Sequence, residues 1–263
     1  MSINPFVKNR IVNFINFRVG NFVTVDEIRI NSPGDASLAE IAYVLTEGEE
    51  KGCLKRARIK NMDGYHVLEL LPNEDDRTEV TLVVSRPKRH RREFSEVQLR
   101  NGQIDTLDCF KDIIASTKSQ LRISSPFIQK NVTNEESFPE FEQLLRNAML
   151  RGVRVKILSR ELFEKREMEA RWLKNIAEKC GTPGQLSVRD YHFQLPDESP
   201  SILSSTHAKM LIADQNMAYI GSGELRMNSL IVNFEVGCLL KGAAVIGAIE
   251  AFDTMFERGT PYE

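Results

Sequence analysis

The stretch from residue 107 to residue 193 alternates between helical and strand-like hydrophobic patterns, and this alternation constrains the fold more than any other feature. Three segments repeat apolar side chains at the spacing of one helix face: residues 107–119, 138–151 and 164–180. Three short apolar runs follow them in turn: residues 121–128, 153–158 and 186–193. Strands that alternate with helices pair mostly in parallel. We therefore predict an α/β domain with a mixed, largely parallel sheet flanked by helices.

The same domain continues to the end of the chain. Three more strands are expected in quick succession, at residues 206–213, 218–221 and 234–240, before a closing helix at 243–258. The polar stretch at 72–77 lacks periodicity and is typical of a linker. These limits predict that this domain spans residues 78–263.

The first 74 residues predict a separate, small α+β domain. A helix begins at Pro5, a short helix follows Thr24, and a third follows Asp35. Two strand-like runs, 54–60 and 65–71, are joined by a turn that contains Asp63-Gly64. The order of three helices and a hairpin resembles a winged helix-turn-helix domain, whose third helix would enter a DNA groove.

Basic residues gather in two places that could contact phosphates. One cluster begins the presumed wing and includes Lys55, Arg56 and Arg58. The other follows a strand predicted at residues 80–85, where the second domain begins, and comprises Arg86, Lys88, Arg89, Arg91 and Arg92. Against DNA binding, the presumed third helix carries several acidic residues, and basic runs are often simply solvated. The small domain is therefore either a DNA-binding or a protein-binding module.

The composition excludes several other classes of function. The net charge of −2 gives no overall attraction to nucleic acid or lipid, and no apolar run approaches the roughly 20 residues of a membrane helix. The four cysteines form no C-x-x-C and the start lacks a secretory pattern, so we expect a reduced, cytoplasmic protein without membrane attachment. Histidines and cysteines at metal-ligand spacing are absent from the sequence, so neither a metal nor another cofactor is expected.

Chemically informative residues concentrate between Ser205 and Gly237. His207-x-Lys209 is followed by Asp214, by Gly221-Ser222 and later by Glu235. On a strand, residues two apart point to the same face, so His207 and Lys209 would present a nucleophile or base and a fixed cation together. This pair suits a phosphodiester substrate.

The spacing of these residues resembles the HKD motif of the phospholipase D superfamily, which includes lipid-cleaving enzymes, cardiolipin synthases and bacterial nucleases. The resemblance implies that His207 attacks phosphorus and forms a phosphohistidine without a metal. It also implies that Lys209 and Ser222 hold the phosphate and that Glu235 orients the histidine, whereas we expect Asp214 to hold a turn. Superfamily members use two motifs, and this chain has one, so we predict a homodimer that shares the site.

One position departs from the superfamily pattern. The motif commonly has Asn two residues after the serine, and this chain has Glu224. A carboxylate there would repel a phosphate unless it is protonated, turned away, or paired with Lys209 or Arg226. Either the site is regulated, weakened or inactive, or Glu224 points elsewhere and Ser222 suffices together with backbone N–H groups.

Three functions follow from this pattern as alternatives. The first is a hydrolase, an endonuclease acting on DNA rather than RNA, because a winged helix and basic clusters suit DNA. The second is a catalytically silent HKD module that dimerises and binds DNA or a protein partner, and the third is a phosphatidyl-transferring enzyme. The architecture is also similar to effectors of antiviral defence, in which an ATPase or helicase partner would control access to the site.

Overall fold

A computed structural model describes residues 3, 5–31, 36–71, 78–87, 102–135, 137–194 and 202–262. The chain forms two compact units, Met1–Arg77 and Thr78–Glu263. Among the described residues, no helix is both long and apolar enough to cross a membrane.

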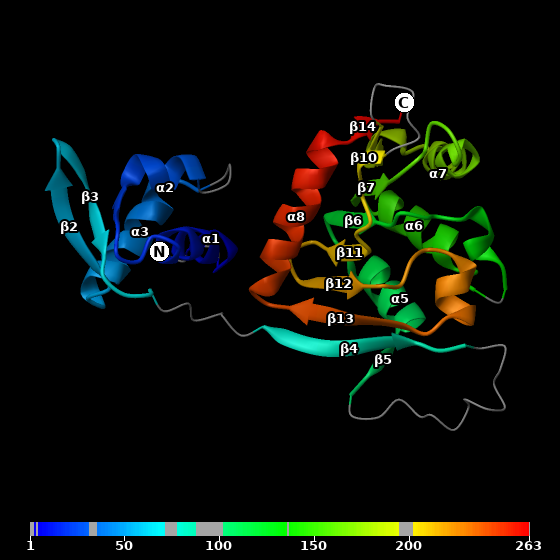
Figure 1. Ribbon diagram of the computed structural model, residues 1–263, viewed down its shortest axis with the longest axis horizontal. Helices are drawn as coiled ribbons and strands as arrows, with labels where there is room; N and C mark the ends of the chain where they lie inside the picture. The colour runs from blue at the N-terminus through cyan, green and yellow to red at the C-terminus, as the bar shows by residue number, and fades with distance from the viewer. Residues whose placement is uncertain are drawn as a thin grey trace. The chain divides into compact units, whose positions relative to one another are not determined.

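The first unit has the element order of a winged helix (Figure 1). Its elements are α1 (Pro5–Asn16), β1 (Phe22–Thr24), α2 (Val25–Asn31), α3 (Leu38–Glu50), β2 (Leu54–Ile59) and β3 (Met62–Val67). The strands form one antiparallel sheet in the order β1-β3-β2. A core that includes Ile11, Ile28 and Ile41 joins the three helices.

The turn of the wing differs from the prediction. Lys60 and Asn61 make the turn, with φ of 49° and 67°, because Ile59 pairs directly with Met62. Gly64 lies inside β3, where a side chain would meet the backbone of β1. The Asp-Gly pair therefore serves the packing of the sheet and not the turn.

The second unit is built on a nine-stranded mixed sheet with the order β14-β8-β7-β6-β11-β12-β13-β4-β5. Its strands are β4 (Glu79–Ser85), β5 (Ile104–Asp105), β6 (Gln120–Ser124), β7 (Arg154–Ser159), β8 (Leu186–Asp190), β11 (Met210–Ala213), β12 (Met217–Gly221), β13 (Glu235–Lys241) and β14 (Thr260–Pro261). A separate ribbon pairs β9 (His192–Gln194) with β10 (Ile202–Ser205).

The sheet is mixed, as predicted, but less parallel than predicted. Parallel pairing joins β6, β7 and β8, where helices connect the strands, and β4 to β5. The strands β11, β12, β13 and β4 pair antiparallel, and β11 also runs antiparallel to β6. Short turns join β11 to β12, and such turns permit only antiparallel neighbours.

Helices cover both faces of this sheet (Figure 1). The helices α5 (Thr106–Ser116), α6 (Phe141–Leu150) and α7 (Glu167–Lys179) pack on one face, and α8 (Ala244–Arg258) packs on the other. Side chains of β11 alternate between the two faces, so Leu211 joins the first core and Ile212 joins the core beneath α8. This double burial fixes the central strands that carry the candidate site.

Candidate active site

The ends of several central strands meet at one edge of the sheet of the second unit. Because β6 and β7 are parallel and β11 is antiparallel to both, the carboxyl ends of β6 and β7 lie beside the amino end of β11. The carboxyl end of β12 and the amino end of β13 reach the same edge, where Gly221 pairs with Gly237. Ligands of open α/β sheets commonly bind at such an edge.

His207 and Lys209 lie at this edge, directly before β11. The predicted strand 206–213 is wrong at its start, because pairing begins at Met210. The hydroxyl of Thr206 accepts a hydrogen bond from the backbone N–H of Ala208 (3.3 Å), and Ser124 donates to the Ala208 carbonyl (3.0 Å). Such local side-chain bonds replace the strand ladder.

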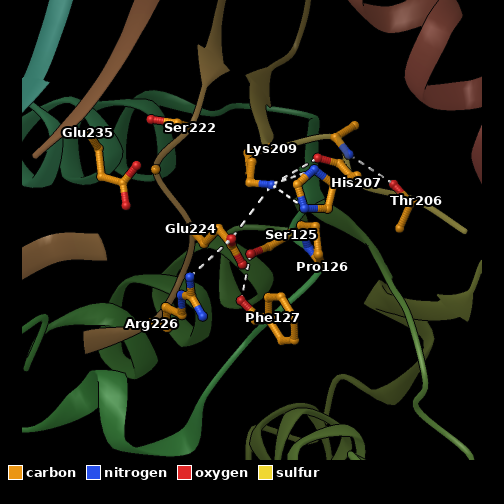
Figure 2. Close-up of polar contacts among 12 residues, drawn as sticks. Ser125, Pro126, Phe127, Thr206, His207, Lys209, Ser222, Glu224, Arg226 and Glu235 are labelled. Carbon is orange, nitrogen blue, oxygen red and sulfur yellow. Dashed lines mark hydrogen bonds and ion pairs between the residues drawn. The ribbon is translucent and has the colours of Figure 1, made fainter. Parts of the chain in front are cut away.

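Lys209 nevertheless meets His207 closely, as Figure 2 shows. Its Nζ lies 3.1 Å from Nδ1 and 3.3 Å from Nε2 of the imidazole and donates to the His207 carbonyl at 3.0 Å. Lys209 is 8% exposed, whereas the imidazole is exposed to solvent. The arrangement presents an exposed imidazole beside a fixed, nearly buried cation.

Glu224 lies beneath this pair and is also buried, with 4% exposure. Its Oε1 forms ion pairs of 3.6 Å with Lys209 Nζ and with Arg226 Nη2 (Figure 2). Its Oε2 is buried and accepts no hydrogen bond from the described residues. Among the alternatives for this carboxylate, the structure shows pairing with both cations.

Ser222 directly follows β12, and Glu235 begins the neighbouring strand β13. Ser222 is exposed, and its Oγ accepts from Val236 N–H (3.1 Å) and donates to the Val236 carbonyl (3.3 Å). Glu235 accepts a hydrogen bond from Asn233 Nδ2 (3.4 Å), and within the described residues no contact joins it to His207. The predicted pairing of Glu235 with His207 is therefore not formed within one chain.

Tyr219 fixes the backbone that carries Ser222. Its ring is fully buried and its hydroxyl accepts the backbone N–H of Gly223 at 2.9 Å. A side chain at Gly221 or Gly237 would collide with this ring. The glycine of the Gly221-Ser222 pair is therefore a packing requirement next to the site.

Asp214 holds a turn at the opposite edge of the sheet. Its carboxylate accepts from the backbone N–H groups of Lys118, Ser119 and Gln120, each at 2.8 Å, and from the Ser119 hydroxyl at 2.7 Å. Burial would raise its pKa, but these hydrogen bonds outweigh burial and lower the pKa below its usual value. The geometry matches the structural role expected for Asp214.

The predicted basic clusters are placed only in part. Arg86 follows β4, whose last residue, Ser85, pairs with Glu235, so Arg86 lies at the edge of the sheet that carries the site. The other arginines and the lysine of that run, Lys88, Arg89, Arg91 and Arg92, lie outside the described residues, as does Asp35.

In the winged unit, Lys55 is exposed on β2, and the other two predicted basic residues of the wing have acidic partners. Arg56 pairs with Glu49 (3.4 Å) and Arg58 with Asp63 (3.5 Å). Such exposed ion pairs are weak and would not prevent phosphate contacts.

Three arginines surround Phe127 beside Glu224, and we did not predict a role for Phe127, Arg160 or Arg166 from the sequence. Phe127 follows β6 and Arg160 follows β7. The signal that could have found them is their position just after two parallel strands, whose carboxyl ends meet at one edge. Within the described ranges, no group of three or more His, Cys, Asp or Glu side chains could hold a metal ion.

Comparison with known proteins identifies the class. The family described as "Cardiolipin synthase, PLD-like domain" matches residues 110–258, which is more than half of the chain. The chain therefore belongs to this phospholipase D-like family. No curated protein matches it.

Solved structures share the fold at low sequence identity. NucT from Helicobacter pylori is 14% identical, with coverage of 71% of this chain and 100% of that chain and a TM-score of 0.51. The phosphatidylserine synthase of Haemophilus influenzae Rd KW20 is 15% identical, with coverage of 97% and 53% and a TM-score of 0.50. The phospholipase D family member Nuc from Salmonella typhimurium is 17% identical, with coverage of 71% and 99% and a TM-score of 0.46.

Proposed function

We propose that this protein is a metal-independent phosphodiesterase that cleaves nucleic acid at a site shared by two copies of the chain. The observation that carries the proposal is the His207–Lys209 pair, in which an exposed imidazole lies 3.1 Å from a nearly buried ammonium group. Among the activities of the family, we choose nucleic-acid cleavage because the first unit has the element order of a winged helix, which is typical of DNA-binding domains.

The proposed reaction proceeds in two displacements at phosphorus. An imidazole nitrogen of His207 forms a bond to phosphorus while the bond to the leaving oxygen breaks, and a protonated His207 of the second copy gives that oxygen its proton. Water then attacks the phosphohistidine, with the second imidazole as base, and releases the phosphate product. Lys209 offsets the charge that develops on the nonbridging oxygens.

Exposed apolar residues on one face of the sheet support the proposal of a second copy of the chain. On the face of the sheet that α8 covers, Ala218 and Leu240 are packed beneath the helix. On the same face, Val80, Leu82, Ile220 and Val236 expose 60%, 40%, 38% and 55% of their surface. We call these four residues the apolar strip. Val236 contacts Ser222, so a two-fold axis through the strip would bring two sites together.

The position of Glu235 supports the same arrangement. Within one chain its hydrogen bond is to Asn233, and it lies on the side of Ser222 away from His207 (Figure 2). The orienting role implied by the motif is therefore assigned to Glu235 acting on His207 of the second copy. A carboxylate bonded to one ring nitrogen would hold the other toward phosphorus.

Subunit mixing tests the proposal. Wild-type protein should cleave DNA in the presence of EDTA, and His207→Ala should not. When unfolded wild-type and His207→Ala chains are refolded together, activity should fall as the square of the wild-type fraction, because one missing imidazole disables the shared site. A linear fall would contradict a shared site, and equal activity of wild type and His207→Ala would contradict the chemistry.

The Glu224 ion pairs favour a second candidate, a silent module that dimerises and binds DNA or a protein partner. The carboxylate is paired with Lys209 and Arg226, the two cations that a phosphate would use, at 3.6 Å each. Orthovanadate distinguishes the two, since an active site should bind it between two His207 side chains and a silent module should not.

A further inference from the structure

Three guanidinium groups converge on one half-buried aromatic ring beside the candidate site. The cation centres of Arg160, Arg166 and Arg226 lie 4.8 Å, 4.0 Å and 5.0 Å from the ring centroid of Phe127. We call these four residues the Phe127 arginine cluster. Its members come from the segments after β6, β7 and β12 and from the start of α7, so the fold and not a local run of charge brings them together.

The cluster carries more positive than negative charge. Arg226 shares Glu224 with Lys209, and Glu161 lies 4.0 Å from Arg166 but also pairs with Lys165 at 2.6 Å. Burial lowers the pKa of Arg166, and the charge of Arg160 acts in the same direction, although nearby acidic groups oppose both. A ring face attracts each cation weakly and removes no charge.

The ring of Phe127 contacts the three guanidinium groups, but not all of their N–H donors make hydrogen bonds. The Nε atoms of Arg160, Arg166 and Arg226 are buried and make no hydrogen bond within the described part of the chain. Arg166 and Arg226 still expose 18% and 29% of their side chains. An anion that reached this surface would therefore meet the exposed parts of Arg166 and Arg226, whose guanidinium groups lie over the ring of Phe127.

Contacts connect the cluster to the reacting residues on two sides. On one side Arg226 contacts Glu224, which contacts Lys209, the neighbour of His207. On the other side Arg160 Nη1 donates to Ser205 Oγ at 3.4 Å, two residues before His207. The cluster is thus an extension of the site, one group further along the same edge of the sheet.

We propose that the Phe127 arginine cluster is a second phosphate subsite, which binds the phosphodiester next to the one attacked by His207. This inference rests on the proposed function and sharpens it, since the substrate is then a polynucleotide strand with successive phosphates. A substrate with a single phosphodiester would use Lys209 and His207 but would leave the cluster empty.

Two substrates distinguish a defect in the Phe127 arginine cluster from a defect at the reacting centre. Bis(p-nitrophenyl) phosphate offers one diester, and oligothymidylate offers many. For the double variant Arg160→Gln/Arg166→Gln, KM for oligothymidylate should rise roughly tenfold or more, as expected for the loss of charged hydrogen bonds. Its kcat/KM for bis(p-nitrophenyl) phosphate should stay within about twofold of the wild-type value. This change is much smaller than the roughly tenfold effect of losing one charged hydrogen bond.

Salt dependence gives a second readout. The logarithm of kcat/KM for oligothymidylate should fall less steeply with the logarithm of salt concentration, by about 0.7 for each lost phosphate contact. Arg160→Lys/Arg166→Lys keeps the charges and should restore most of the slope. Arg154→Gln is the matched control, because Arg154 is exposed at the opposite end of β7 and should change neither readout.

An equal loss of kcat/KM on both substrates in the glutamine double variant, or no loss on either, would overturn the proposed subsite. Impaired cleavage of cardiolipin vesicles together with unimpaired cleavage of oligothymidylate would overturn it in favour of a lipid substrate. If wild-type protein cleaves neither phosphodiester, the proposed function fails, and fluorescence anisotropy of labelled oligothymidylate decides the subsite. Weaker binding by the glutamine double variant than by Arg154→Gln then supports it, and equal binding overturns it.

Discussion

Nζ of Lys209 lies 3.6 Å from Oε1 of Glu224. The carboxylate is therefore paired with the lysine that, in the superfamily motif, contacts the phosphate. Two unit charges about 4 Å apart interact by roughly 4 kcal/mol near a protein surface. A phosphate that enters the site must compete with this attraction and also meets repulsion from Glu224. We therefore expect this ion pair to contribute to the stability of the folded chain and, under the proposed function, to oppose substrate binding.

Glu224→Gln should separate these two effects. Loss of the carboxylate charge should lower KM for oligothymidylate roughly tenfold, the equivalent of about 1.4 kcal/mol. The same change leaves Lys209 and Arg226 without their counter-ion and should lower the free energy of unfolding by about 1–3 kcal/mol. Steady-state kinetics and urea denaturation measure the two. Glu167→Gln, which removes an exposed ion pair on α7, is the control; an unchanged KM for Glu224→Gln would contradict the competition.

The apolar strip gives a prediction about assembly. Val236→Asp and Leu82→Asp place a charge on the surface proposed to meet a second copy, whereas both side chains are exposed in the single chain. Light scattering should therefore show monomers, with nuclease activity reduced at least roughly tenfold and the free energy of unfolding of the chain changed by less than about 0.5 kcal/mol.

Leu150→Asp is the control for this pair of variants. Leu150 is an exposed apolar residue at the end of α6, away from the strip, and its substitution should leave the dimer intact. Dimers that persist in both strip variants, at concentrations where wild type is dimeric, would rule out this surface.

Local patterns were sufficient to predict most elements of the fold. The helices α5, α6 and α7 and the strands between them follow from apolar spacing, because each buries one face on the sheet. Pairing direction was harder to predict, since β6 is a neighbour of β7 through a helical crossover and of β11 only through tertiary contact. For that reason, the prediction that the sheet is largely parallel was wrong, although the sheet is mixed as predicted.

The candidate site was predictable to the extent that its residues are close in sequence. His207 and Lys209 follow from the motif, although the strand assigned to them was wrong because Thr206 and Ser124 bind that backbone locally. The ion pairs of Glu224 were one of several alternatives. Phe127 and Arg160 are 33 positions apart in the numbering and meet only because β6 and β7 end together, which no local pattern reveals.

Gly237 should tolerate no side chain, although its strand is regular. A Cβ built there would lie 2.7 Å from Cζ of Tyr219, whose buried ring packs against β13 and Phe110. Gly237→Ala should therefore lower the free energy of unfolding by about 1–3 kcal/mol. Gly247→Ala is the control, since Gly247 is exposed on α8 with open space around it and alanine there should add about 0.5–1 kcal/mol. A loss at Gly247 equal to that at Gly237 would contradict the steric explanation.

Asp214 should make the second unit sensitive to acid. Burial raises its pKa, but hydrogen bonds from Ser119 and from the backbone of Lys118 and Gln120 bring the net pKa below the usual 3.8. A carboxyl group whose pKa is lower in the folded chain contributes stability that is full above its unfolded pKa. That contribution disappears as pH falls from about 4 through the lower folded pKa.

Asp214→Asn keeps one acceptor and removes the charge, so it should lower the free energy of unfolding by about 1–2 kcal/mol at pH 7. As pH falls through the lowered folded pKa, the difference between wild type and Asp214→Asn should shrink, since the wild-type carboxyl becomes protonated as well. Urea denaturation at several pH values measures this. Asp108→Asn, a variant of an exposed carboxyl group in the first turn of α5, should show a small difference at every pH. A gap between wild type and Asp214→Asn that does not shrink as the pH is lowered from 7 until the chain unfolds would show that Asp214 acts by shape alone.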